Sequence, residues 1–155
     1  MTNERKKDFT MRITQANKTE MIVILYEMVL AYLDDAEDTF EDRDAFKESI
    51  KKTRECMNEL MNSLDYQFEL SQMLFRLYVF IGKTLTASVA HHVREPLAGV
   101  RAIIEKLHSA YQEVSGQDHS ESVMANTQTV YAGLTYGRRS LNENCYSVVN
   151  RGYFA

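Results

Sequence analysis

The chain has one proline and six glycines among its 155 residues, and this shortage of chain-breaking residues limits its fold more than any other feature. Proline and glycine punctuate most turns and loops, so a chain with so few of them is built mainly from long uninterrupted segments. Four of the six glycines stand at or after position 116. We therefore expect long helices over the first three quarters of one domain.

Apolar residues recur at intervals of three or four in four segments, which is the pattern of a helix with one buried face. The four expected helices run from Asn17 to about Glu41, from about Asp44 to Leu64, from Asp65 to about His91, and from Pro96 to about Gly116. The buried positions that this spacing selects are Ile22, Leu25, Val29, Tyr32 and Ala36; Phe46, Ile50, Thr53, Met57, Leu60 and Leu64; Leu70, Leu74, Leu77, Ile81 and Leu85; and Leu97, Val100, Ile104, Leu107, Tyr111 and Val114.

Local signals set the expected helix ends. Asn17 followed by Glu20 is typical of a capping box, in which each side chain satisfies a free backbone amide of the other. Asp65 is expected to cap the third helix, Pro96 fits the first turn of the fourth, and Gly116 stands just past its end.

The short links between these helices favour an all-α, antiparallel up-down four-helix bundle over residues 17–116. Residues 1–16 carry four basic and two acidic side chains and few large apolar ones, and we interpret them as a mobile N-terminal arm with Phe9 and Ile13 as its contact residues. Residues 117–155 are rich in Gly, Asn, Ser and Thr and carry several tyrosines, so we expect a less regular C-terminal tail.

Charge and hydropathy exclude several classes of function. The formal charge of −4 disfavours nucleic acid and anionic membranes as main partners. The longest apolar run, Met21–Leu33, contains Glu27 and is shorter than the roughly 18 residues that suggest a membrane span. The N-terminus lacks the apolar stretch of a secretory signal. We expect a cytoplasmic protein without a membrane span.

Motifs that carry catalysis or bind metals are scarce. The chain contains no Gly-rich phosphate loop and no nucleophile elbow, and Cys56 and Cys145 form no metal-binding spacing. A di-metal helical bundle needs two Glu-x-x-His pairs, whereas Glu105 and His108 provide one. The adjacent His91 and His92 are interpreted as a helix-end pair. We expect no enzymatic activity, no cofactor and no metal.

Two of the expected helices carry more apolar surface than a bundle core requires. Ile24 and Met28 lie off the buried face of the first helix, and Phe68, Phe75 and Val79 form a second stripe on the third. A wide core, coverage by the arm or tail, or a homo-oligomer would each account for these residues. A groove for a partner helix or extended segment is the sharper interpretation, and eight methionines suit an adaptable surface of that kind.

Three segments together resemble a known family. They are NKTEMIVILYE from Asn17 to Glu27, ELMNSLD from Glu59 to Asp65, and LFRLYVF from Leu74 to Phe80. Their order and spacing over about residues 9–115 are similar to those of the FliS-type flagellar export chaperones. Lys18 stands where that family has a proline, Gln67 to Glu69 stand where it has a Gly-Gly pair, and Tyr111 stands where it has a tryptophan.

The resemblance implies a cytosolic chaperone that binds the disordered C-terminal region of flagellin, prevents its premature polymerisation and presents it to the flagellar export apparatus. It implies no use of ATP or metal. We take Ile24, Met28, Phe68, Phe75 and Val79 as the groove residues, and we expect the tail to compete for the groove. The chain is expected to be a monomer or a weak homodimer, and the alternative function is a homodimeric helical-bundle scaffold.

Overall fold

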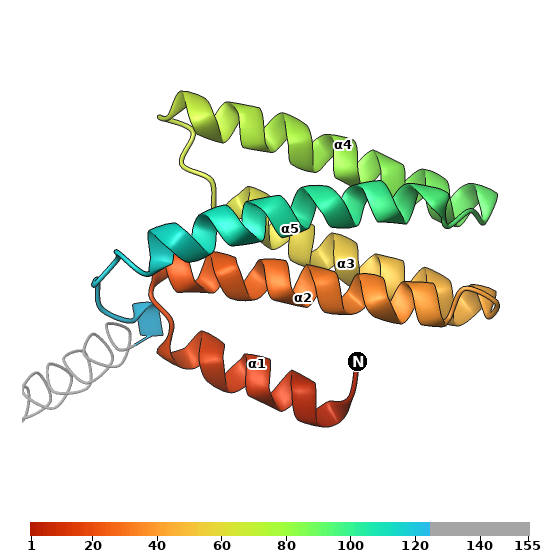
Figure 1. The fold of residues 1–155 in the computed structure, drawn as a ribbon, viewed down its shortest axis with the longest axis horizontal. Coiled ribbons are helices and arrows are strands. Elements are labelled where there is room, and N and C mark those ends of the chain that lie inside the picture. Colours follow the sequence, from red (N-terminus) through yellow and green to blue (C-terminus); the bar gives the residue numbers. More distant parts are fainter. Residues whose placement is uncertain (125–155) are drawn as a thin grey trace, which may run out of the picture.

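A computed structural model describes residues 1–124 of the chain. These residues form five helices and no strand, which confirms the all-α class (Figure 1). The helices are α1 (Asn3–Gln15), α2 (Lys18–Asp38), α3 (Arg43–Asn62), α4 (Glu69–His91) and α5 (Glu95–Ser115). Most of the expected tail, residues 125–155, lies outside the described residues.

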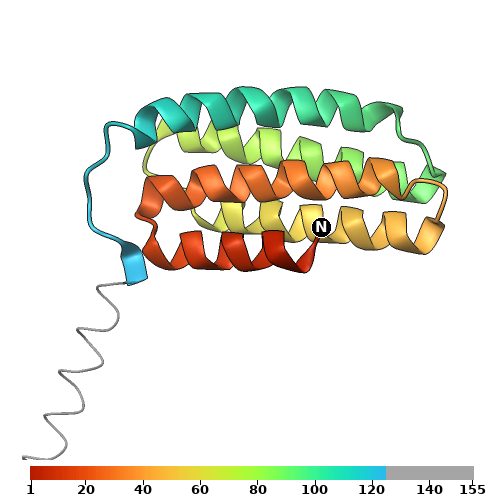
Figure 2. The same ribbon diagram turned by 60° about the horizontal axis from the view of Figure 1, so that its bottom comes forward.

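Helices α2 to α5 lie side by side and enclose the main core (Figures 1 and 2). Helix α2 packs against α3 and α5, and α4 packs against the same two helices, so the four form a closed ring of contacts. The largest side chains that are fully buried in this core include Tyr26, Leu33, Phe46, Ile50, Met57, Leu60, Tyr78, Ile81, Leu85, Leu97 and Ile104. Helix α1 lies outside the ring, along α2.

Several expected helix ends are confirmed. Asn17 and Glu20 form the reciprocal capping box at the start of α2, with both hydrogen bonds at 2.8 Å. Pro96 lies in the first turn of α5, and Gly116 follows its last residue. His92 follows the last residue of α4 in the left-handed backbone conformation, so it is a helix-end residue. Its ring stacks on that of Phe40, with the ring centroids 4.3 Å apart.

The N-terminal residues differ from the expectation of a mobile arm, because they form a helix of their own. Phe9 is buried in α1 and is only 4% exposed, packed in a small cluster with Ala16, Ile24 and Ala31. Ile13 joins the edge of the same cluster. Phe9 and Ile13 are four residues apart and lie on the same face of α1. This face packs on an apolar side of α2 that lies outside the main core, and the contact orders the N-terminal segment as a helix.

The start of α4 also differs from the expectation. Asp65 does not cap the helix but accepts a hydrogen bond from the backbone N–H of Gln67 within the preceding turn, and α4 begins at Glu69 after Phe68, which makes no capping bond. Leu70, expected in the core, lies at the surface, whereas Tyr78 is buried. Leu74, Ile81 and Leu85 are buried as expected, so the buried face of α4 is the selected one shifted toward Tyr78 and away from Leu70.

The buried face of α2 is shifted in the same way from the selected one, which is confirmed at Val29 and Ala36. Tyr26 and Leu33 are fully buried beside Val29, whereas Leu25 and Tyr32 are only half-buried. Helix α2 has neighbours on three sides, α1, α3 and α5, so apolar residues surround most of it. Among the other helices, the face expected for α3 is confirmed up to Leu60, and Val114 at the end of α5 is exposed instead of buried.

Length and composition alone would allow α4 to cross a membrane, and α4 is the one helix of the described residues with this property. Helices that contribute one face to the core of a soluble protein meet the same criterion. Leu74, Tyr78, Ile81 and Leu85 of α4 are buried in the main core, while much of the rest of the helix surface is apolar and open.

Candidate protein-binding surfaces

Two of the three segments that carry the family resemblance meet in the main core. The hydroxyl groups of Tyr26 on α2 and Tyr78 on α4 hydrogen-bond to each other in a buried position. Tyr111 of α5 packs on Tyr26 with ring centroids 5.6 Å apart. Burial raises the pKa of Tyr78 to about 12, so its hydroxyl stays protonated and available as a donor. These tyrosines fix the positions of α2, α4 and α5 relative to one another.

A groove runs between α3 and α4, with a volume of about 450 Å³. Met57 and Met61 of α3 line one side, and Val79 and Gly82 of α4 line the other. A Cβ atom built on Gly82 would meet nothing within 4 Å, so the space above this glycine is open. The groove is wide enough at this point for another backbone to approach closely.

An exposed aromatic cluster lies near one end of this groove. Phe75 of α4 is 39% exposed and contacts Tyr66 edge-on, with ring centroids 5.9 Å apart. Phe68 is 63% exposed. The predicted groove residues Phe68, Phe75 and Val79 thus lie along one side of α4, where Phe68 and Phe75 are open to solvent and Val79 is half-buried. Open apolar surface of this extent is typical of a protein-interaction site.

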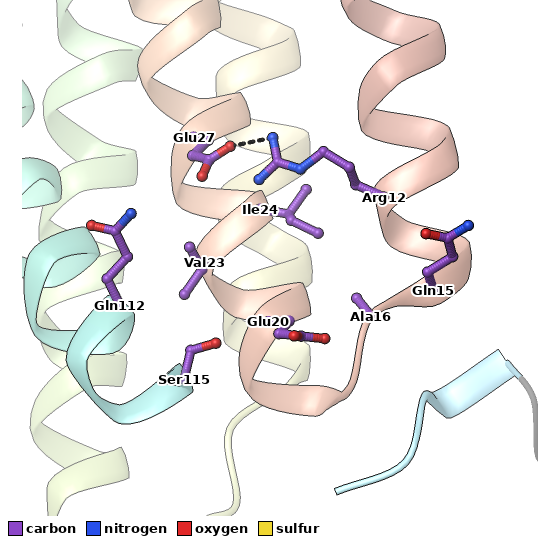
Figure 3. Close-up of a pocket in the computed structure, with 9 residues that line it drawn as sticks. All are labelled: Arg12, Gln15, Ala16, Glu20, Val23, Ile24, Glu27, Gln112 and Ser115. Atoms are coloured by element: carbon purple, nitrogen blue, oxygen red, sulfur yellow. Dashed lines mark ion pairs between the residues drawn. The ribbon is translucent and has the colours of Figure 1, made fainter. Parts of the chain in front are cut away.

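The other two predicted groove residues lie beneath α1. Ile24 is 4% exposed and is buried in the cluster of Phe9, with Met28 packed at its edge. Figure 3 shows Ile24 of α2 directed toward α1, with Val23 beside it on the side of α5. A hollow of about 470 Å³ opens between α1, α2 and the end of α5. The structure therefore separates the five predicted residues into an open set on α4 and a set that α1 covers.

An ion pair fastens α1 over this second surface. Arg12 of α1 lies 2.6 Å from Glu27 of α2, between Nη1 and Oε2 (Figure 3). His108 of α5 approaches the other oxygen of Glu27 at 3.5 Å. Partial burial raises the pKa of Glu27. The hydrogen bond and the positive charge of Arg12 lower it by more, so the pKa of Glu27 lies below its ordinary value. His108 of α5 thus lies against Glu27 of α2.

Both ends of α1 are also held. The N-terminal ammonium group pairs with Asp35 near the end of α2. At the other end, the backbone N–H of Val123 donates to the carbonyl of Ala16 at 3.1 Å, and the side-chain amide of Asn17 donates to the carbonyl of Asp118 at 3.3 Å. The described part of the tail therefore closes over the turn between α1 and α2.

The sequence interpretation missed three open apolar residues on α4. Leu70, Met73 and Phe80 are 62%, 63% and 56% exposed. The sequence contained a signal for this open face, because these three residues and Leu77 repeat at intervals of three and four. The repeat is one residue out of phase with the buried set of Leu74, Tyr78 and Ile81. Two apolar faces on one helix cannot both be buried in a closed ring of four helices.

Comparison with known families identifies this arrangement of helices. A family model, described as flagellar protein FliS, matches residues 1–118, which include all five helices and the turn that follows them. No curated protein matches the chain. The match covers more than two thirds of the sequence and includes all three segments that carry the resemblance. The chain therefore belongs to the FliS family of flagellar proteins.

Proposed function

We propose that this protein is a cytoplasmic export chaperone that binds the disordered C-terminal region of flagellin, prevents its premature polymerisation and delivers it to the flagellar export apparatus. The observation that carries the proposal is the open apolar side of α4 and the adjoining α3/α4 groove in a chain of the FliS family. A monomeric soluble protein rarely exposes such a surface unless a partner covers it.

The first step of binding is proposed in the α3/α4 groove. A disordered segment that forms a helix can place its apolar side chains beside Phe75 and Val79 while its backbone passes over Gly82. The segment loses conformational entropy when it becomes ordered, and the burial of apolar area on both sides offsets this loss. Methionines at 57 and 61 line the groove with flexible, polarisable side chains that adapt to different sequences.

The second step involves the surface beneath α1. Ile24 and Met28 already bind an amphipathic helix, since α1 packs on them through Phe9 and Ile13. Helix α1 is a thirteen-residue segment with few buried residues, so its attachment is weak compared with that of α2 to α5. A flagellin helix with a longer apolar face could take its place. In this proposal α1 protects Ile24 and Met28 until flagellin arrives.

Binding of this kind requires neither nucleotide nor metal. A flagellin segment whose apolar side chains are buried in the chaperone is no longer free to pack against another flagellin subunit. The complex then presents the rest of flagellin to the export apparatus.

Charge substitutions in the open set test the proposal. Phe75→Asp and Val79→Asp are each expected to weaken binding of a flagellin C-terminal fragment at least tenfold in calorimetric titration, because a carboxylate would be buried at the contact. Met11→Asp, at an exposed methionine of α1, is the matched control. Circular dichroism must show unchanged helicity in all three variants. Unchanged affinity in the two α4 variants would contradict the proposed site.

A further inference from the structure

The α3/α4 groove carries charge as well as apolar surface. Two charged side chains line it, Arg54 of α3 and Lys83 of α4, and both are positive. The described residues place no acidic side chain among those that line the groove. The chain as a whole has a formal charge of −4, so a site with only positive charges stands out from the rest of the surface.

The two cations lie toward the same end of the groove. Arg54 precedes Met61 by about two turns on α3, and Lys83 follows Val79 by about one turn on α4. The short link of residues 63–68 joins the end of α3 to the start of α4, so on each helix the cation is farther from this link than the apolar residue. The groove therefore has an apolar end next to the link and a basic end away from it.

Neither cation has an acidic partner within residues 1–124. Ion pairs along a helix form between residues three or four positions apart. None of the residues at these distances from the two cations is acidic: they are Ile50, Lys51, Met57 and Asn58 on α3, and Val79, Phe80, Thr86 and Ala87 on α4. By contrast, Lys51 and Lys52 both pair with Glu48. The positive charges at the basic end are therefore open to a partner from outside.

We propose that the basic end of the groove binds a side-chain carboxylate of the flagellin segment, so that the chaperone selects an amphipathic segment with an Asp or Glu about one helical turn beyond its apolar residues. This inference rests on the proposed function, because it specifies the segment that occupies the same groove. Val79 and Lys83 are about 6 Å apart along the axis of α4, which corresponds to about one turn of a bound helix. Opposite charges fix the register of the segment and its direction in the groove.

The carboxylate belongs to a side chain and not to the end of the flagellin chain. Ala87 and Ala90 continue the groove beyond Lys83, and both are exposed. A bound segment has room to continue over these small residues, so it does not need to end at the cations. Asn58 lines the groove one turn from Arg54, and its side-chain amide can donate a further hydrogen bond to the carboxylate.

Charge reversal at the basic end tests the proposal, with the full chain titrated calorimetrically against a flagellin C-terminal fragment. Arg54→Glu and Lys83→Glu are each expected to weaken binding about three- to tenfold, because an open ion pair is replaced by a pair of like charges. Lys47→Glu makes the same kind of charge change at an exposed position of α3 outside the groove, and this matched control is expected to bind as the wild type does. Circular dichroism must show unchanged helicity in all three variants.

Flagellin fragments in which one Asp or Glu at a time is replaced with Lys identify the carboxylate. One such fragment is expected to bind the wild-type protein weakly and to regain affinity for Lys83→Glu, because the ion pair forms again with the charges exchanged. A set of fragments without any such rescue would overturn the proposal. A fragment with an amidated C-terminus is expected to bind as the unmodified fragment does, and weaker binding would overturn the assignment to a side chain.

Failure of this contact and failure of the proposed function give different results. Unchanged affinity in Arg54→Glu and Lys83→Glu, in a chain whose binding Phe75→Asp weakens, would overturn the acidic contact and leave the proposed function standing. An equal loss of affinity in Lys47→Glu would also overturn the contact, because the effect would then come from the overall charge. No binding of the fragment by the wild-type protein would overturn the proposed function and the acidic contact with it.

Discussion

Replacing Phe9 with alanine is expected to release α1 from α2 while the ring of α2 to α5 stays folded. Phe9 is the one buried residue within α1 and contributes most of the apolar contact that α1 makes with Ile24 and Ala31. The main core cluster does not include Phe9. The substitution therefore removes the contact that orders α1 and leaves the packing between α2 and α5 unchanged.

The size of the expected loss of stability follows from the burial of the Phe9 ring. Truncation of a buried phenylalanine to alanine costs about 3 to 5 kcal/mol, and we take the lower value because Phe9 has α2 on one side only. Detached from α2, a helix of thirteen residues is unstable in water, so α1 as a whole would melt. If flagellin must displace α1 to reach Ile24 and Met28, the wild-type protein loses this ~3 kcal/mol on binding and the variant does not. The variant is therefore expected to bind flagellin up to about 100-fold more tightly than the wild type.

Two measurements on the same variant test this reasoning. Hydrogen exchange followed by mass spectrometry is expected to show loss of protection over α1 and unchanged protection over α2 to α5. Calorimetric titration with a flagellin C-terminal fragment is expected to show higher affinity. Met11→Ala, on the exposed side of α1, is the matched control and is expected to change neither result.

Weaker flagellin binding by Phe9→Ala would refute the view that α1 covers the binding surface, because it would mean that α1 itself contributes to the complex. Retained protection of α1 would refute the energetic argument, since α1 would then be held by contacts other than Phe9.

Three further predictions concern other parts of the structure. Attachment of α1 is expected to weaken in acid, because the pKa of Glu27 lies below its ordinary value of 4.5. The stabilisation that ionised Glu27 gives to the attachment of α1 is complete above pH 4.5 and is lost as the pH falls through the lowered pKa. Hydrogen exchange of α1 against pH measures this loss, and Glu27→Gln should remove the pH dependence. Tyr26→Phe is expected to cost about 1 to 2 kcal/mol in urea unfolding because Tyr78 loses its buried partner, and the double variant with Tyr78→Phe is expected to cost less than the sum of the two single changes. Deletion of residues 125–155, which keeps the contacts of Asp118 and Val123, is expected to tighten flagellin binding in calorimetry if the tail competes for the groove, and unchanged affinity would contradict that role.

Features with a local cause could be predicted from the sequence. The capping box at Asn17 and the first turn at Pro96 depend on a few neighbouring residues, and the structure confirms both. The buried face of α3 was also predicted correctly, because its apolar residues form one narrow stripe with polar residues on all other sides. In such a helix the periodicity allows a single choice of face.

Features that depend on several neighbours could not be predicted in the same way. Helix α2 is apolar around most of its circumference because α1, α3 and α5 all contact it, so the spacing did not favour Tyr26 over Leu25. Helix α4 carries two apolar faces next to each other, and the selected face included Leu70, which is exposed. The sequence interpretation placed apolar residues on these helices correctly but did not determine which of them the core would cover.

The same limit applies to the candidate site. Phe68, Phe75 and Val79 were selected because they lie off the buried face of α4, and the structure places all three along one side of that helix, with Phe68 and Phe75 open to solvent. Ile24 and Met28 were selected by the same reasoning, but α1 covers them. Phe9 and Ile13 were recognised as contact residues of the N-terminal segment, yet their helical order depends on the face of α2 against which they pack.

Calorimetric titration of this protein with flagellin, full length and lacking its last ~40 residues, tests the central claim most directly. The account predicts binding of one chaperone to one full-length flagellin and no binding of the shortened form. Equal binding of the two forms would contradict recognition of the C-terminal region, and no binding of either form would contradict the chaperone function itself.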